Sequence, residues 1–241
     1  FDRNANYSEV GKYANMAKIV AVEAGIKNIN LDLIYGIENQ TLKDLENDLK
    51  IYTSLPIKHI SAYMLTPYEN TPLGKLVENN KYNLPDEKLA TDMFFLINEY
   101  LENNGFKRYE LSNWAKNGYE CKHNLLYWTD KQFLGIGVSA WSYVGNKRFG
   151  NTKNIYTYID KVEKGIKPIS FEETLDKNDK RIENIMLGLR LRQGIYLSFL
   201  KDKKDTLQEL VKNNFANIEN GKFYLTEKGL MVINKIVEML L

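Results

Sequence analysis

The stretch Asn28-Ile-Asn-Leu-Asp-Leu-Ile-Tyr-Gly-Ile-Glu-Asn-Gln-Thr41 decides the fold of this chain. Its first half reads as a buried β-strand that carries one carboxylate, Asp32, within an apolar run. The strand breaks at Gly36, and a short polar loop leads to a helix that opens at Thr41. A strand followed at once by a helix indicates an α/β protein, in which an acid near the carboxyl end of a parallel strand usually serves a ligand.

The composition bounds the class of protein. The chain has 241 residues, 44% of them hydrophobic and 27% charged, as in an ordinary soluble protein of one or two domains. The formal net charge of +2 gives no electrostatic support for binding nucleic acid or an acidic membrane. No apolar run approaches the ~20 residues of a membrane span. We therefore expect a cytoplasmic protein without a transmembrane segment and without a nucleic-acid partner.

Cysteine usage supports the same expectation. Cys121 is the single cysteine in the chain, so an internal disulfide is excluded and a reducing compartment fits. A self-contained thiolate zinc site or iron–sulfur cluster is also excluded, because both need several ligands.

Apolar periodicity and capping residues predict alternating helices and strands over the first two thirds of the chain. The expected helices cover residues 7–24, 41–55, 86–104 and 154–163. The expected strands cover residues 29–35, 59–65, 109–113 and 133–144. We expect a loop with one helical turn at residues 66–85, and a second, long loop from the end of the third strand through residue 128. This spacing implies parallel strands with crossover helices.

The character of the chain changes after Asp176. We expect helices over residues 181–191 and 207–212, a hairpin turning at Asn220-Gly221, and a last helix capped by Thr226. This is a winged-helix-like order, and it places a domain boundary within residues 165–177, between domains of residues 1–170 and 171–241. From Tyr196 onward, seven Lys or Arg and six Asp or Glu leave a net charge of +1. This charge is too small for a DNA-binding surface, so we expect a small domain whose role is structural packing.

Three constellations are candidates for a site, and each has a plain structural alternative. Asp32 either accepts hydrogen bonds from a ligand or merely holds its strand end. The segment from Cys121 to Trp128 gathers His123, Asn124 and aromatic residues on an expected loop, which is either functional or an anchored surface loop. The segment from Gly135 to Tyr143 lets a backbone approach a ligand closely, or packs as a tight strand. His59, at the start of a strand, is expected to be a satisfied edge histidine.

Taken in order, many short segments resemble the oxygen-independent coproporphyrinogen III oxidase family, most closely its haem-chaperone branch. They are Asn28-Ile-Asn-Leu-Asp-Leu-Ile-Tyr-Gly, Gln40-Thr41, His59-Ile-Ser-Ala-Tyr, Thr71-Pro, Tyr109-Glu-Leu-Ser-Asn-Trp-Ala, His123-Asn-Leu-Leu-Tyr-Trp, Leu134-Gly-Ile-Gly-Val-Ser-Ala, Met186-Leu-Gly-Leu-Arg-Leu-Arg-Gln-Gly and Leu225-Thr-Glu-Lys-Gly. The resemblance covers nearly the whole chain, and an ordered set of this length is far more specific than any one segment.

The resemblance implies a radical S-adenosylmethionine (SAM) protein. Its fold is a partial (β/α) barrel, here residues 1–170, followed by a helical, winged-helix-like domain, here residues 171–241. The family carries a 4Fe–4S cluster on a Cys-x-x-x-Cys-x-x-Cys loop, and its oxidases decarboxylate porphyrinogen propionates to vinyls. The chaperone branch binds haem and passes it to apoproteins. This chain lacks the cysteine motif, so it resembles the C-terminal two-thirds of the family and is expected to hold no cluster alone.

The resemblance also assigns roles to matching positions. Asp32 matches an aspartate that contacts SAM, and Thr66 a position that contacts SAM mainly through its backbone. Trp141 matches an apolar contact near the adenine, although the chaperone branch usually has histidine there, and Arg3 matches an arginine that faces SAM. The chaperone-branch motif of His123, Asn124 and Tyr127 is a candidate contact for haem or substrate.

The expected function is therefore that of a haem chaperone in the intact protein, with haem or porphyrinogen and haem-accepting apoproteins as partners. Two alternatives remain open, a true decarboxylating oxidase and a non-enzymatic interaction module. A part-barrel also exposes apolar edge strands, which predicts dimerisation or poor solubility.

Overall fold

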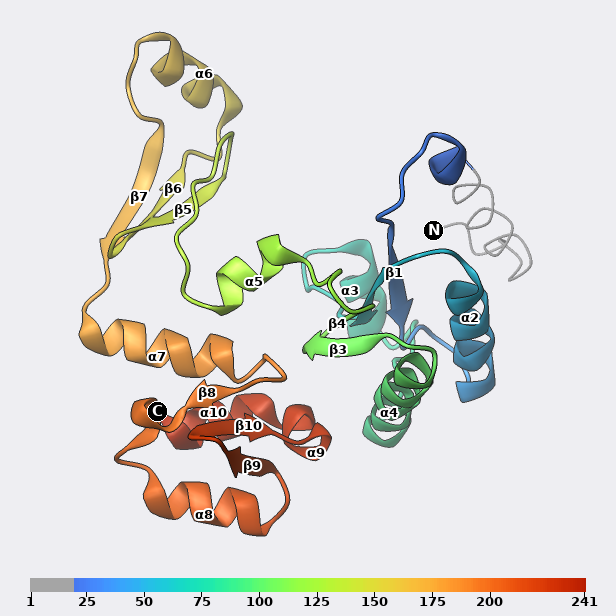
Figure 1. Cartoon of the computed structure of the whole chain (residues 1–241). Coiled ribbons are helices and arrows are strands. Elements are labelled where there is room, and N and C mark those ends of the chain that lie inside the picture. The colour runs from blue at the N-terminus through green and yellow to red at the C-terminus, as the bar shows by residue number, and fades with distance from the viewer. Residues whose placement is uncertain (1–19) are drawn as a thin grey trace. The chain divides into compact units, whose positions relative to one another are not determined.

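The structure is a computed structural model that describes residues 20–241 and divides into two compact units, residues 1–120 and 121–241 (Figure 1). The helix expected over residues 7–24 lies mostly outside the described residues. Its last turn, residues 20–23, is helical and ends at Gly25, whose φ of +81° suits a helix C-terminus. The domain boundary expected within residues 165–177 stays a prediction.

The first unit is built on a four-stranded sheet in the order β1-β2-β4-β3. Strand β1 (Asn30–Tyr35) pairs with β2 (His59–Met64) in parallel, and α2 (Leu42–Ser54) makes the crossover between them. The expected parallel pair is thereby confirmed. The strand expected over residues 109–113 is wrong in detail, because β3 (Lys107–Glu110) turns tightly into β4 (Asn113–Ala115), and β4 runs antiparallel to both neighbours.

Helix boundaries in this unit follow the capping residues. Thr41 and Asp44 form a reciprocal capping box at the start of α2, and Asp86 caps α4 (Glu87–Asn103). Thr71 caps the short helix α3 (Pro72–Glu78), which replaces the single turn expected in that loop.

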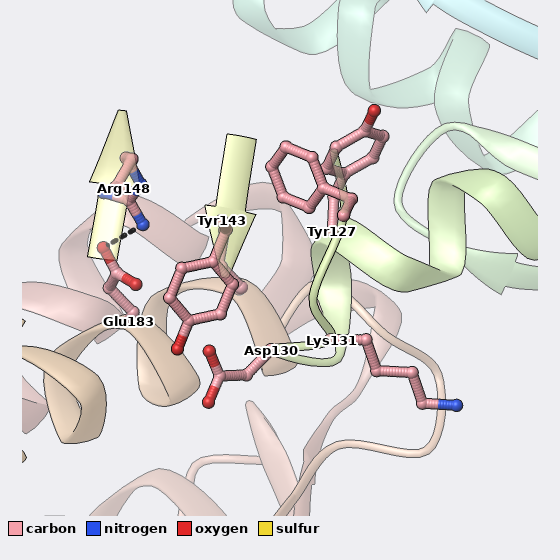
Figure 2. A pocket seen from close by; sticks show the side chains of 8 residues that line it. Tyr127, Asp130, Lys131, Tyr143, Arg148 and Glu183 are labelled. Atoms are coloured by element: carbon pink, nitrogen blue, oxygen red, sulfur yellow. Dashed lines mark hydrogen bonds and ion pairs between the residues drawn. The ribbon is translucent and has the colours of Figure 1, made fainter. Parts of the chain in front are cut away.

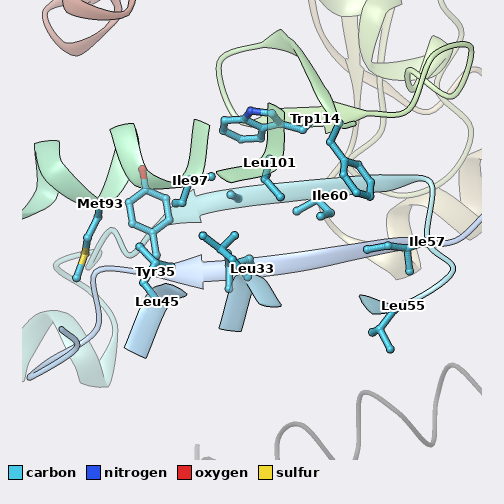
Figure 3. Close-up of a cluster of buried hydrophobic side chains, with 13 residues drawn as sticks. Leu33, Tyr35, Leu45, Leu55, Ile57, Ile60, Met93, Ile97, Leu101 and Trp114 are labelled. Atoms are coloured by element: carbon cyan, nitrogen blue, oxygen red, sulfur yellow. The ribbon is translucent and has the colours of Figure 1, made fainter. Parts of the chain in front are cut away.

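One face of this sheet packs against α2 and α4, and this layer holds the core (Figure 3). Leu33, Ile60 and Trp114 from three neighbouring strands meet Leu45 and Ile97 from the two helices, and all are at most 4% exposed. Burying each such side chain contributes about 1.5–3 kcal/mol. Because side chains alternate along a strand, the residues between these apolar ones lie on the opposite face of the sheet.

The second unit begins with α5 (Lys122–Trp128) and an antiparallel sheet in the order β5-β6-β7. The strands are β5 (Trp141–Val144), β6 (Lys147–Asn151) and β7 (Ile169–Thr174), with α6 (Ile155–Glu163) between the last two. The long strand expected over residues 133–144 is wrong, because only its last four residues form β5, and Phe133 makes an isolated bridge to Tyr143. The helix expected over residues 154–163 is confirmed, with Asn154 as its cap.

The rest of the second unit has the expected winged-helix-like content. Helices and a three-stranded sheet of order β8-β10-β9 surround a small core. The elements are α7 (Lys177–Gly188), β8 (Ile195–Tyr196), the 3-10 helix η1 (Leu197–Leu200), α8 (Lys204–Lys212), β9 (Ala216–Glu219), β10 (Lys222–Leu225), α9 (Glu227–Met231) and α10 (Ile233–Leu240).

The hairpin between β9 and β10 is confirmed. Asn220 and Gly221 both have positive φ, +51° and +74°, as a type I′ turn requires. The final helix capped by Thr226 is split in two at Val232, which the sequence pattern did not predict.

Candidate functional site

Polar residues gather on the face of the first unit's sheet that lies opposite the helices. Asn30 and Asp32 alternate along β1, and His59 and Ser61 occupy the register positions beside them on β2. Tyr109 of β3 reaches the same face, since its hydroxyl contacts His59. We call these five residues the polar sheet face. It lies entirely within the first unit.

Asp32 is exposed on this face, which corrects the expectation of a buried acid. The apolar run around it is real, but Leu33 and Tyr35 point to the helices while Asp32 points away from them. Asn30 Nδ2 donates a 2.7 Å hydrogen bond to Asp32 Oδ1. On the other side of the strand, Tyr52 Oη of α2 donates to the Asp32 carbonyl oxygen at 2.9 Å. Both the carboxylate and its backbone are thus held in place while the side chain stays accessible.

His59 lies beneath this pair and is only 6% exposed. Its Nδ1 lies 2.6 Å from Asn30 Oδ1, and its Nε2 lies 2.8 Å from Tyr109 Oη. Burial lowers the pKa of His59, and the charges of Asp32 and Glu120 oppose that effect in part. The imidazole is therefore neutral near neutral pH, and both ring nitrogens have partners, as expected. The expected edge position is wrong, because β2 lies between β1 and β4 in the sheet.

The loop after β1 is fixed by side chains rather than by regular structure. Gly36 has a φ of +76°, and its N–H donates to the buried Gln40 Oε1 at 2.8 Å. Gln40 Nε2 in turn donates to Asp48 Oδ2 of α2 at 3.4 Å. Thr66, two residues beyond β2, is exposed, and its hydroxyl donates to the Met64 carbonyl at 3.3 Å. These bonds shape the edge of the sheet at which β1 and β2 end.

The second unit carries the other predicted site residues. His123, Asn124 and Tyr127 lie on helix α5, not on the loop expected there. One turn of the helix separates His123 from Tyr127, so Tyr127 Oη lies 2.9 Å from His123 Nε2, with the rings edge to face. His123 and Tyr127 are both exposed, whereas Asn124 is half-buried.

An aromatic row continues from this pair. Tyr127 packs edge to face on Phe133 with ring centroids 4.6 Å apart, and Phe133 contacts Tyr143 of β5. Together with Arg148 and Glu183, which form an ion pair at 2.5 Å, these residues line a cavity of about 210 Å³ (Figure 2). Pockets for drug-sized ligands are roughly 300–1,000 Å³, so this cavity does not enclose a macrocycle such as haem.

Trp141 opens β5 and is 46% exposed. Its ring lies 5.3 Å from that of Phe171 on β7 and covers Gly150 on β6, where a Cβ atom would come within 3.3 Å of the indole. The indole is thus supported from below and offers an open apolar surface. Arg3 lies outside the described residues. Asp32 and Thr66 belong to the first unit and Trp141 to the second, so their common SAM site stays a prediction.

The iron–sulfur cluster that the resemblance implies for the intact protein does not fit the residues present in this chain. The sequence holds one cysteine, Cys121, and a cluster needs several thiolates. Within residues 20–241, no group of three or more His, Cys, Asp or Glu side chains converges as a metal site would require. Among the helices in that range, none combines the length and apolar character that crossing a membrane requires.

Sequence reasoning singled out Asp32 but gave His59 and Asn30 no functional role. The signal was present in the spacing, since Asn30, Asp32, His59 and Ser61 are polar residues at alternate positions of two consecutive predicted strands. Tyr109 carried no comparable signal, because its contact with His59 spans 50 residues of sequence.

Comparison with solved structures identifies the fold of the chain. The chain superposes on coproporphyrinogen III oxidase (HemN) from Escherichia coli, described as a radical SAM enzyme, with a TM-score of 0.74. The match covers 95% of this chain and 58% of that one, at 18% sequence identity, so it shows a shared fold. The expected α/β fold of a radical-SAM partial barrel with a small C-terminal domain is thereby confirmed. No protein-family model matches the chain.

Sequence comparison points to particular relatives. Heme chaperone HemW of Bacillus subtilis (strain 168) is 31% identical over 226 residues, which are 90% of this chain and 59% of the relative. Heme chaperone HemW of Mycobacterium tuberculosis (strain ATCC 25618 / H37Rv) is 30% identical over 95% of this chain and 59% of its own length. The protein of the same name from Haemophilus influenzae is 31% identical over 98% of this chain and 62% of its own length.

These relatives confirm the resemblance to the haem-chaperone branch of the coproporphyrinogen III oxidase-like proteins. The chain spans about three fifths of the length of the curated relatives it matches.

Proposed function

We propose that this chain serves in a haem chaperone with a radical-SAM fold. The observation that carries the proposal is that relatives from distant bacteria, all named Heme chaperone HemW, align with 90% or more of this chain. The likeness to the oxidase HemN is a likeness of fold at 18% identity. The comparisons therefore favour the chaperone over the decarboxylating oxidase and over an interaction module unrelated to haem.

The second part of the proposal assigns SAM to the polar sheet face. Asp32 supplies an exposed, oriented carboxylate, which suits hydroxyl or ammonium donors of the kind that SAM carries. Thr66, Trp141 and Arg3 are the further contacts that the family resemblance suggests. SAM bound beside a reduced iron–sulfur cluster supplies radical chemistry, but this chain's single cysteine provides no cluster, and no radical step is assigned to it.

The third part assigns haem to the surface of α5. The cavity beside Tyr127 is too small for the macrocycle, so haem would lie on the exposed helix with His123 as its iron ligand. A haem iron held by His123 Nε2 would replace the contact that this nitrogen makes with the Tyr127 hydroxyl at 2.9 Å. Haem-accepting apoproteins are the partners that a chaperone role requires.

Haem titration tests the proposal. We expect the protein to bind haem with a Soret shift, and His123→Ala to weaken binding at least about tenfold because the iron–nitrogen bond is lost. The sequence has two histidines, so His59→Asn is a matched control that should leave haem affinity unchanged. Unchanged haem binding in His123→Ala would remove His123 from the site, and no haem binding by the wild type would refute the chaperone role for this chain.

A further inference from the structure

We infer that His59 is a positioning residue that orients Asp32 for its ligand by fixing the side-chain amide of Asn30. The inference rests on the proposed SAM site and adds to it a residue that does not touch the ligand. Its basis is a continuous line of hydrogen bonds from Tyr109 through His59 and Asn30 to Asp32, across β3, β2 and β1.

The direction of each bond follows from the chemistry of its partners. The Asp32 carboxylate only accepts, so the group of Asn30 that faces it at 2.7 Å is the NH2 group. Asn30 Oδ1 therefore faces His59 Nδ1 at 2.6 Å and must accept there, which places the imidazole proton on Nδ1. In the neutral ring Nε2 is then an acceptor, and the Tyr109 hydroxyl donates to it at 2.8 Å.

This arrangement excludes the other orientation of the Asn30 amide. With oxygen and nitrogen exchanged, the amide oxygen would face the Asp32 carboxylate, and two acceptors at 2.7 Å repel each other whichever tautomer His59 adopts. The Ser61 hydroxyl, 3.3 Å from Asn30 Oδ1, adds a second donor that favours the observed orientation.

The burial gradient along the line indicates what it serves. His59 is 6% exposed and Ser61 is 4% exposed, whereas Asn30 and Asp32 are exposed. The buried side chains of His59 and Ser61 thus hold Asn30, which in turn holds the accessible Asp32 carboxylate. Tyr52 Oη also donates to the backbone carbonyl of Asp32. Orienting a group before its ligand arrives removes an ordering cost from binding. The ligand class that fits is a small molecule with a pair of hydroxyl donors or an amino group.

Two substitutions at one position separate positioning from packing. In His59→Asn the amide nitrogen occupies the place of Nδ1, so it keeps the donor to Asn30 and loses the contact with Tyr109. In His59→Gln the amide reaches the place of Nε2, so the contact with Tyr109 is kept and the donor to Asn30 is lost. Both replace the ring by a neutral amide, and thermal unfolding of each variant verifies that it is folded.

The readout is SAM affinity by calorimetry or equilibrium dialysis, with Asp32→Asn as the reference for losing the carboxylate. We expect His59→Gln to weaken binding about three- to tenfold, as loss of one hydrogen bond does, and His59→Asn to stay within about twofold of the wild type. Equal effects of the two variants would overturn the inference and leave the SAM site standing. No SAM binding by the wild type would refute the SAM site itself, and the inference with it.

Nitrogen-15 NMR of the imidazole gives a readout that needs no ligand. With two histidines in the sequence, spectra of His123→Ala assign the His59 signals directly. We expect a neutral ring protonated on Nδ1, the less common tautomer of free histidine. A ring protonated on Nε2 would overturn the inference whatever the affinities.

Discussion

At the scale of single residues, Asp48 on α2 is a carboxylate that the fold makes costly to ionise. Burial and the nearby charge of Asp44 raise the pKa of Asp48 to about 6, although a hydrogen bond from Gln40 lowers it in part. Since the folded pKa lies above the unfolded value of 3.8, the folded state takes up a proton first as pH falls through 6. Asp48 therefore lowers stability above pH 6, and this effect disappears below the unfolded pKa.

Asp48→Asn should remove the free-energy cost of a buried negative charge, while the new amide oxygen can still accept the hydrogen bond from Gln40. We expect the free energy of unfolding to rise by about 1 kcal/mol at pH 7.5, after allowance for solvent screening, with no gain at pH 3. Urea unfolding at both pH values measures it. Asp44→Asn is the opposite control, because hydrogen bonds from Thr41 lower the pKa of Asp44 and its loss should destabilise α2 at pH 7.5. A gain for Asp48→Asn that persists at pH 3 would contradict the account.

The site residues show what a sequence reveals at this scale. Asp32 could be singled out because an acid in an apolar run is conspicuous. The exposure of Asp32 could not be predicted, since it depends on which face of β1 the helices cover. The role of His59 also depends on its contacts. The alternating polar positions of two strands hint at the contact with Asn30, but local patterns carry no information on the contact with Tyr109, 50 residues away.

At the scale of elements, β8 and β10 depend on a glycine between α7 and β8. Gly194 has a φ of +62°, and a Cβ atom there would lie 2.1 Å from the Phe223 carbonyl oxygen on β10. The neighbour is strand backbone, which cannot move aside without breaking the pairing of Phe223 with Ile195. Glycine is therefore required at this position for two reasons: it adopts the positive φ without strain, and its lack of a Cβ atom allows the two strands to approach closely.

We expect Gly194→Ala to destabilise the protein by about 3 kcal/mol or more, since strain and overlap add. Gly221→Ala is the matched control, because Gly221 also has positive φ (+74°) but has open space around its Cβ position. It should cost only about 1 kcal/mol. Denaturant unfolding followed by circular dichroism gives both values. Equal losses would show that backbone strain alone, and not the β8–β10 contact, sets the cost.

Elements with strong local signals could be predicted, and the others could not. Helices α2, α4 and α6 begin at the capping residues that the sequence displays. Strands β6 and β7 were missed because charged residues, such as Lys147 and Glu172, interrupt their patterns and find each other only across the sheet. Helix α5 was taken for a loop, since its cap position holds Cys121, which gives no side-chain cap.

At the scale of the whole molecule, the open edge of the first sheet predicts self-association. Among the described residues, β1 has no neighbour on its outer side, and Ile34 on this strand is 45% exposed. Unpaired edges with apolar side chains favour pairing between chains. We expect a dimer that strengthens with concentration, measured by light scattering after gel filtration.

Ile34→Lys should shift this equilibrium to monomer, since a charge on an edge strand opposes pairing. Ile218→Lys is the control, because Ile218 is also 45% exposed on an edge strand, β9. A dimer that survives Ile34→Lys but is lost in Ile218→Lys would place the contact on the other sheet. A monomer at every concentration would refute the prediction.

The single thiol of this chain gives the proposed haem site a built-in place for a reporter. Cys121 is the N-cap residue of α5, two positions before His123, and it is partly accessible. A fluorophore attached there has one position in the molecule, at the start of the helix that would receive haem. Because haem quenches nearby fluorescence strongly, the transfer of haem onto α5 and away to an acceptor protein becomes visible in real time, without any engineered label site.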